Sequence, residues 1–186
     1  MVLNEEQLIE GIKQGDSQCQ SLFYKKHASS LYGMALRYTR SEDDAKDVLQ
    51  DAFIKIFDSI KQYSGKGAIG AWMTRIVINQ ALKLYQQRQK HQMLSLDDES
   101  QQEINDESIV VSDILTHEML LGFIRELPDG YRMVFNLCEI EGYSHEEVAE
   151  MLNYTASTSR SQLSKAKQSL RKKINDFNEK ETRILR

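Results

Sequence analysis

The sequence predicts an all-α protein made of two small helical domains. Proline occurs once in 186 residues and glycine nine times, so the residue types that most often interrupt helices are scarce. Apolar residues recur three and four positions apart through most of the chain, which is the helical period. Residues from about 92 to 105 are polar, low in aromatics and without that period, so we expect a flexible acidic linker at 92–111 between domains at 1–91 and 112–186.

The first domain is expected to contain four helices, because four apolar-periodic segments are separated by capping residues or glycines. Their expected spans are 4–15, 16–39, 41–63 and 68–88. In the second span, the period places Leu22, Phe23 and Leu31 toward the core. Helices of these lengths with short connections favour a compact bundle.

The third expected helix has a polar face beside its apolar stripe. This face carries four aspartates with an amide and an aliphatic neighbour: Asp44, Asp47, Asp51, Asp58, Gln50 and Ile54. Acidic residues in the first turn favour the helix dipole, so the pattern does not require a partner. The alternative function of the face is docking on a basic protein surface.

The fourth expected helix aligns an aromatic ring with cationic and amide side chains. These residues lie three or four positions apart on the side away from the apolar stripe: Trp72, Arg75, Asn79, Lys83 and Gln86. Such side chains contact phosphates and unstacked bases. Alternatively, Trp72 is a partly buried anchor at the edge of the bundle.

The C-terminal part predicts two helices joined by a tight turn. Ser144 and Glu147 form a capping box for the first helix, and Asn153 suits the left-handed turn that ends it. The second helix, from about residue 156, has a face of short polar side chains and lysines: Ser157, Thr158, Ser161, Ser164, Lys165, Gln168 and Lys172. Such a face suits the DNA major groove, although an ordinary solvated helical hairpin shows similar spacing.

The charges are distributed unevenly, although the net charge is only −4. Residues 96–118 include eight acidic residues and no basic one, whereas the segment after residue 156 is basic. The average therefore conceals a basic C-terminal helix, which is compatible with binding to nucleic acid.

No feature of the sequence indicates an enzyme, a membrane protein or a metalloprotein. The four histidines, Cys19 and Cys138 lack metal-ligand spacing, and no glycine-rich nucleotide motif occurs. No apolar run approaches the length of a membrane span. We therefore expect no catalytic residue, metal or cofactor, and a cytoplasmic protein with reduced, buried thiols.

Three segments in order carry a resemblance to a known family. Residues 43–57 resemble the polymerase-binding helix of bacterial sigma factors, and residues 71–82 resemble their downstream-promoter-element helix. Residues 127–135, with the C-terminal helix pair, are similar to their upstream-element-binding domain. Without a long N-terminal extension or an extra domain, the chain resembles the compact extracytoplasmic-function (ECF) group of the sigma-70 family.

The resemblance implies two partners, core RNA polymerase and promoter DNA. The positions that dock on the clamp helices of the β′ subunit are matched here by Asp47, Gln50 and Asp51, with Ile54 on the same face. The second domain is expected to contact the β flap. An anti-sigma factor, often membrane-anchored, is expected to cover the polymerase-binding surface.

The resemblance also assigns residues to two promoter elements. The loop 64–70 matches one that captures a base flipped from the −10 element. The expected −10 contacts are Lys66, Ile69, Trp72, Arg75, Asn79 and Lys83. The expected −35 contacts are Ser157, Thr158, Arg160, Ser161, Ser164, Lys165 and Gln168.

Some positions depart from the family pattern. Ile69 stands where phenylalanine is usual, Ser159 where valine is usual, and Gln162 where arginine is common. Loss of that arginine predicts weaker phosphate binding. The main alternative for the whole chain is a stand-alone helix-turn-helix regulator whose N-terminal bundle serves as a sensor or a dimerisation module.

Overall fold

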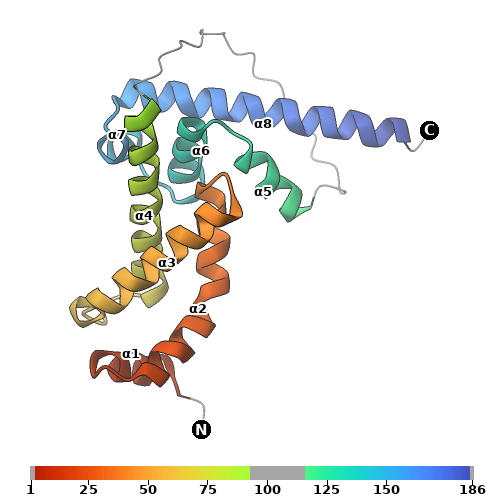
Figure 1. Cartoon of the computed structure of the whole chain (residues 1–186). Coiled ribbons are helices and arrows are strands. Elements are labelled where there is room, and N and C mark those ends of the chain that lie inside the picture. Colours follow the sequence, from red (N-terminus) through yellow and green to blue (C-terminus); the bar gives the residue numbers. More distant parts are fainter. Residues whose placement is uncertain (1–2, 93–115, 185–186) are drawn as a thin grey trace. The chain divides into compact units, whose positions relative to one another are not determined.

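The computed structural model describes residues 3–92 and 116–184, and Figure 1 shows the chain. The described residues form helices and no strand, which confirms the all-α prediction. The chain divides into two compact units, Met1–Leu84 and Tyr85–Arg186, with the division inside one helix. The expected linker at 92–111 lies outside the described residues, except for its first residue.

The first unit begins with two helices, α1 (Glu5–Lys13) and α2 (Ser17–Tyr38). Both start at predicted caps: the Asn4 side chain accepts a hydrogen bond from the Gln7 backbone N–H, and the Asp16 carboxylate accepts from two backbone N–H groups. The Glu5 carboxylate ties the helices together, since Oε1 lies 2.7 Å from Lys26 Nζ and 3.0 Å from His27 Nε2.

The helix α3 (Glu42–Ser59) packs against α2 and is followed by a short 3-10 turn, η1 (Ile60–Gln62). Its N-terminus is capped by Ser41 Oγ, which accepts a hydrogen bond from the Asp44 N–H at 3.1 Å. The buried residues of α3 form one stripe: Ala45, Val48, Leu49, Ala52, Phe53 and Ile56. The spacing predicts Phe57 in this stripe, which is only partly buried, and leaves out Val48. The inward placement of Leu22 on α2 was wrong, because this side chain is 47% exposed while its neighbour Phe23 is fully buried.

The helix α4 (Ile69–Gln92) continues four residues beyond the predicted end. Its buried residues recur with the helical period and leave the other side of the helix uncovered. They include Ile69, Met73, Val77, Ile78, Ala81 and Leu82. Burial of this stripe fixes the rotation of α4 about its own axis.

The second unit contains α5 (His117–Arg125), α6 (Asp129–Phe135) and a π-helical turn, η2 (Asn136–Ile140). The Arg132 side chain is 2% exposed, forms an ion pair with Asp129, and donates to the carbonyls of Arg125 and Leu127 at 2.9 and 2.8 Å. These carbonyls belong to the end of α5 and the turn after it. The buried guanidinium therefore satisfies backbone acceptors that would otherwise lack a donor.

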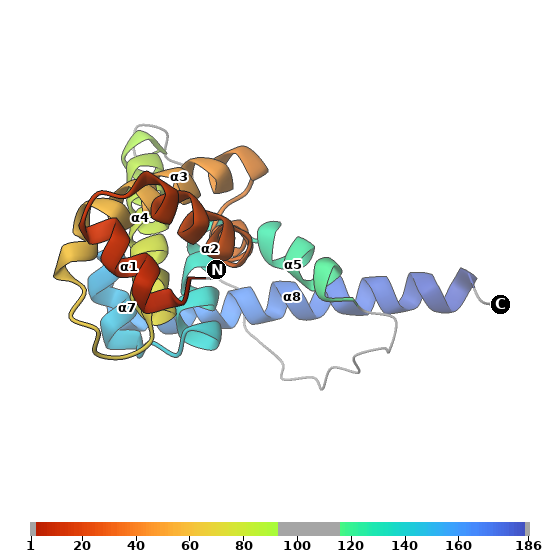
Figure 2. The ribbon, with the colours of Figure 1, turned by 90° about the horizontal axis from the view of Figure 1, so that it is seen from below.

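The last two helices are α7 (His145–Leu152) and α8 (Ala156–Ile184). The predicted capping box is present: the Ser144 N–H donates to Glu147 Oε2 at 2.8 Å, and the Glu147 N–H donates to Ser144 Oγ at 3.2 Å. The Ser144 N–H and the Ser144 hydroxyl, at 2.9 Å, both donate to Glu147 Oε2, and they lower the pKa of the Glu147 carboxyl because they favour its charged form. Asn153 ends α7 in the left-handed region, with φ 57°, as predicted. In both views α8 is a single long helix with α5 beside it (Figures 1 and 2).

None of the helices in the described part of the chain is both long enough and apolar enough to cross a membrane. Cys19 and Cys138 are both free thiols. Cys19 is buried, as expected, whereas Cys138 is only partly buried.

The close approach of α1 to α2 gives a stability prediction. A Cβ added at Gly11 would lie 2.4 Å from Cys19 Sγ, whereas a Cβ at Gly33 would meet no atom within 4 Å. We expect Gly11→Ala to lower the free energy of unfolding by about 1–3 kcal/mol, as overpacking does. The matched control Gly33→Ala should leave it unchanged or raise it by up to about 1 kcal/mol. Urea unfolding measures both, and equal effects would contradict the packing account.

Candidate functional site

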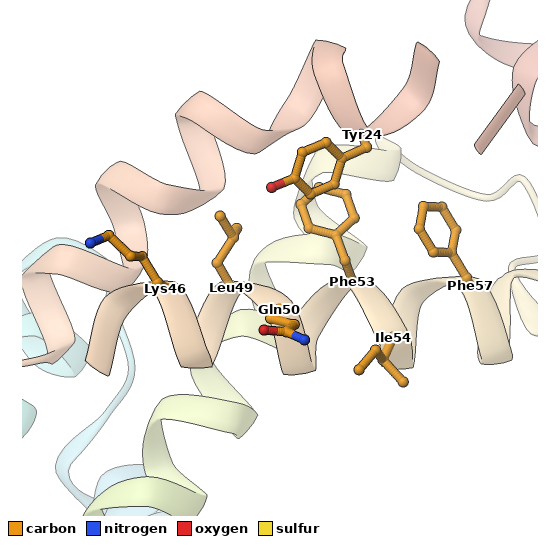
Figure 3. A pocket seen from close by; sticks show the side chains of 7 residues that line it. All are labelled: Tyr24, Lys46, Leu49, Gln50, Phe53, Ile54 and Phe57. Carbon is orange, nitrogen blue, oxygen red and sulfur yellow. The ribbon is translucent and has the colours of Figure 1, made fainter. Parts of the chain in front are cut away.

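A groove opens between α2 and α3 on the first unit (Figure 3). Its lining residues come from both helices: Tyr24, Lys46, Leu49, Gln50, Phe53, Ile54 and Phe57. The Tyr24 ring lies against Phe53, with centroids 4.5 Å apart, and Phe53 in turn contacts Phe57. Tyr24 remains 43% exposed and Ile54 53% exposed, so the groove presents apolar surface to solvent.

The polar face predicted on α3 borders this groove. Gln50 and Ile54 line it, and Ile54 points away from α2 (Figure 3). Asp47 and Asp51 are exposed on the same side of α3 as these two residues. Carboxylates beside an exposed aliphatic patch form a surface that suits a protein partner with basic and apolar groups. Sequence reasoning missed Tyr24, because its contact with α3 is a tertiary one.

The loop before α4 is held by an aromatic pair. The rings of Tyr63 and Trp72 have centroids 5.6 Å apart, and Tyr63 Oη donates to the Gly67 carbonyl at 2.6 Å. Gly65 and Gly67 have φ angles of 74° and 83°, which side-chain-bearing residues rarely adopt. The loop therefore holds a defined shape next to Trp72. No pattern within one helix indicates Tyr63, because its partners lie across the loop.

The predicted −10 residues separate into two groups. Arg75, Asn79 and Lys83 are exposed along one side of α4, with the partly buried Trp72 one turn before Arg75, and Lys66 is exposed in the loop. Ile69 is different, because its side chain is 5% exposed. It packs inward at the start of α4 and is not available to a ligand at the surface.

The predicted −35 residues lie on the uncovered side of α8. Ser157, Ser161 and Gln168 are exposed, and Ser164 and Lys165 are partly exposed. The opposite side is buried through Leu163, Ala166, Leu170 and Ile174.

Two residues of the predicted −35 set are already engaged within the protein. The Thr158 hydroxyl lies 2.9 Å from the Thr155 hydroxyl, which also accepts the Thr158 N–H and caps α8. Arg160 Nη1 lies 3.6 Å from Glu146 Oε1 on α7, with both side chains more than half exposed. An exposed pair of this kind is weak, so Arg160 can exchange Glu146 for a phosphate.

Ser159 on α8, at the position where the sequence resemblance expects valine, is fully buried and faces η2 and α7. Its Oγ lies 2.9 Å from His145 Nδ1, and Cys138 Sγ lies 3.7 Å from the same nitrogen. Burial raises the pKa of the Cys138 thiol, so this thiol stays protonated at neutral pH. The polar cluster therefore holds the start of α8 against α7 where a valine could form no hydrogen bond.

Gln162, the other departure on α8, is partly buried against α6. A Cβ at Gly130 would lie 2.5 Å from Gln162 Oε1, so the glycine makes room for this side chain. The residue fills an internal contact between α8 and α6, and its polar group is directed away from the exposed face of α8.

The buried cluster gives a second prediction. We expect Ser159→Ala to lower the free energy of unfolding by about 1 kcal/mol, because it removes the hydroxyl that pairs with His145. Ser157→Ala, two residues earlier on the exposed side, should change it by less than about 0.5 kcal/mol. Chemical unfolding of both variants checks this, and a Ser159→Ala protein as stable as the wild type would show that the hydroxyl contributes nothing.

Comparison with known proteins matches both units to one family. Residues 23–91 match the family model of Sigma-70 region 2, and residues 117–170 match that of Sigma-70 region 4. The two regions occur in the family order and together span most of the described chain. A stand-alone helix-turn-helix regulator would not be expected to carry region 2, so the sigma-factor interpretation is supported over that alternative.

Individual relatives match along nearly their whole length. The chain is 28% identical to the ECF RNA polymerase sigma-E factor of Haemophilus influenzae over 92% of this chain and 96% of that protein. It is 27% identical to the sigma-E factor of Escherichia coli K12 (92% and 95%). The RNA polymerase sigma-H factor of Pseudomonas aeruginosa is 26% identical (91% and 93%).

Two solved structures are similar at a TM-score of 0.48. One is CnrH in complex with the cytosolic domain of CnrY, at 20% identity over 91% of this chain and 96% of that one. The other is the sigma factor RpoE in complex with the anti-sigma factor NepR from Bartonella quintana, at 19% identity (81% and 94%). The two matched regions and the full-length relatives establish that this chain belongs to the sigma-70 family of RNA polymerase sigma factors, in its ECF group.

Proposed function

We propose that this protein binds core RNA polymerase through the face of α3 beside the groove, and promoter DNA through the exposed faces of α4 and α8. The observation that carries the proposal is the presence of regions 2 and 4 in one chain, each with an uncovered face of matching chemistry. Functionally, we divide the chain into a region 2 domain at 1–91, a linker at 92–111 and a region 4 domain at 112–186.

The polymerase contact is proposed to combine an apolar anchor with charge. Ile54 and the ring of Tyr24 expose apolar surface at the groove, and burial of such anchors usually provides most of the binding energy of an interface. Asp47 and Asp51 are exposed beside them, so their carboxylates would meet basic groups of the β′ clamp helices and set the orientation of docking.

The −10 contact is proposed to centre on the loop held by Tyr63 and Trp72. Flipping a base out of the duplex costs a few kcal/mol, and a shaped pocket with polar contacts offsets that cost. The positive φ angles of Gly65 and Gly67 give the loop a shape in which its backbone can come close to a nucleotide. Arg75, Asn79 and Lys83 then line the side of α4 along which the melted strand would run.

The −35 contact is proposed to use the polar side of α8 as a recognition helix in the major groove. Ser161, Lys165 and Gln168 are spaced three or four residues apart, so they lie above one another on this side. Serine, lysine and glutamine side chains can all read base edges in this groove. The second domain would also contact the β flap of the polymerase.

The remaining roles follow from membership of the ECF group. An anti-sigma factor would inhibit the protein by covering the groove and the carboxylates of α3, since occupation of that surface excludes the clamp helices. The chain would act in the cytoplasm, together with the polymerase. We assign it no catalytic residue, because the chemistry of RNA synthesis belongs to the polymerase.

Charge reversal on α3 tests the polymerase contact. Asp51→Arg places a cation where the proposal requires a carboxylate, so we expect its affinity for core polymerase to fall at least tenfold. Glu10→Arg makes the same charge change on exposed α1 and should bind like the wild type. Co-elution of each purified chain with core polymerase measures this. Equal binding by all three chains would contradict the assignment of α3.

Removal of the Tyr63 hydroxyl tests the loop. Tyr63→Phe keeps the ring beside Trp72 but loses the hydrogen bond to Gly67, which is worth about 1 kcal/mol. We therefore expect open-complex formation at a mapped promoter to fall about fivefold. Permanganate reactivity of thymines in the −10 element reports the open complex. Binding of Tyr63→Phe to core polymerase should not change. If Tyr63→Phe opened the promoter at the same rate as a Tyr143→Phe control, the role of the loop would be refuted.

A further inference from the structure

We propose that Lys172 binds a backbone phosphate at the edge of the −35 element, and that the DNA-binding side of α8 ends at this residue. The inference rests on the proposed function of α8 and extends it, because the match to region 4 ends at residue 170. Lys172 lies in the part of α8 that continues beyond that match, since the helix extends to Ile184.

Lys172 lies on the same side of α8 as the proposed base-reading residues. It follows Ser161 by eleven positions and Lys165 by seven, so it is rotated only about 20° from each of them around the helix axis. It is exposed, whereas its neighbours Leu170 and Ile174 are buried on the other side of the helix. The polar side of α8 therefore continues without a break from Ser161 to Lys172.

Distance along the helix separates base contacts from backbone contacts. Lys172 lies about 16 Å along the helix axis from Ser161. The major groove is about 12 Å wide, and a recognition helix places its N-terminal residues against the base edges. With Ser161 in the groove, Lys172 lies beyond the base edges, over the sugar-phosphate backbone. A flexible ammonium group at that place can bind a phosphate but cannot read sequence.

The adjacent lysine has a different environment. Lys173 is partly buried and its ammonium pairs with the Glu126 carboxylate, at the end of α5. Phe123 of α5 and Phe177 of α8 also contact, with centroids 6.3 Å apart, so this side of α8 is covered by α5. No ion pair within the described residues involves Lys172, which leaves its charge available to DNA. Two consecutive lysines thus provide a test residue and a matched control.

The first exposed carboxylates on the same side come soon after Lys172, with only the neutral, exposed Asn175 between them. Asp176 lies one turn after Lys172, and Glu179 follows it. Their carboxylates would repel the phosphates of a DNA backbone that continued along α8. Lys180 is exposed after these carboxylates, but it is rotated about 80° from Lys172 around the helix axis, so the side that carries the proposed base-reading residues and Lys172 ends in acidic residues.

Salt dependence of DNA binding tests the proposal. The full chain is titrated into a fluorescein-labelled 40-base-pair duplex of random sequence between 50 and 200 mM KCl. The wild type is compared with Lys172→Ala, Lys173→Ala and Lys165→Ala. A random duplex suffices because a phosphate contact does not depend on sequence. One lost contact lowers the slope of log K against log[salt] by about 0.9. Relative to the wild type, Lys172→Ala should bind about fifteenfold more weakly at 50 mM and about fourfold more weakly at 200 mM.

The variants separate failure of the inference from failure of the proposed function. Lys173→Ala should retain the wild-type slope, and Lys172→Arg should restore it. If Lys165→Ala weakens binding while Lys172→Ala and Lys173→Ala both behave like the wild type, the role of Lys172 is wrong and that of α8 stands. If no substitution changes the affinity or the slope, α8 does not carry the DNA contact, and the proposed −35 function fails with the inference.

Discussion

Burial of one apolar stripe fixes the rotation of each long helix about its own axis, and every candidate surface of this protein depends on that constraint. On α3 the stripe that includes Ala52 and Ile56 is buried, which leaves Asp51 and Ile54 in solvent. A rotation of α3 by one residue, about 100°, would bury a carboxylate without a partner, at a cost of several kcal/mol. The same physics that stabilises the helices therefore determines which side chains can reach a partner.

The second unit adds a polar constraint to this apolar one. The buried Arg132 guanidinium binds the backbone carbonyls at the end of α5, while Ser159 and His145 join α8 to α7. Buried polar groups are costly unless each is paired, so they favour one arrangement of the helices over near alternatives. The hydrophobic cluster around Leu170 stabilises the packing of α8 against the rest of the second unit, and these hydrogen bonds specify the position of α8.

Local features of the fold were predictable from the sequence, whereas contacts between helices were not. The caps at Asn4 and Ser144 and the left-handed Asn153 depend on a few adjacent residues, and the structure confirms them. Leu22 was misplaced because periodicity alone does not say where the apolar face of a helix ends. The contact of Tyr24 with Phe53 depends on how α2 packs against α3, which spacing within one helix does not contain.

Recognition in this protein depends on several individually modest contacts: a groove with flanking carboxylates on α3, a loop before α4, and one side of α8. Their combined function is tested most directly by transcription in vitro. Core polymerase transcribes genomic DNA fragments with and without the purified chain, and the transcription start sites are mapped. The account predicts start sites that appear only with the chain and share sequence elements near −35 and −10. If no such start sites appeared, while the chain alone bound a symmetric duplex operator tightly, the central claim would be contradicted.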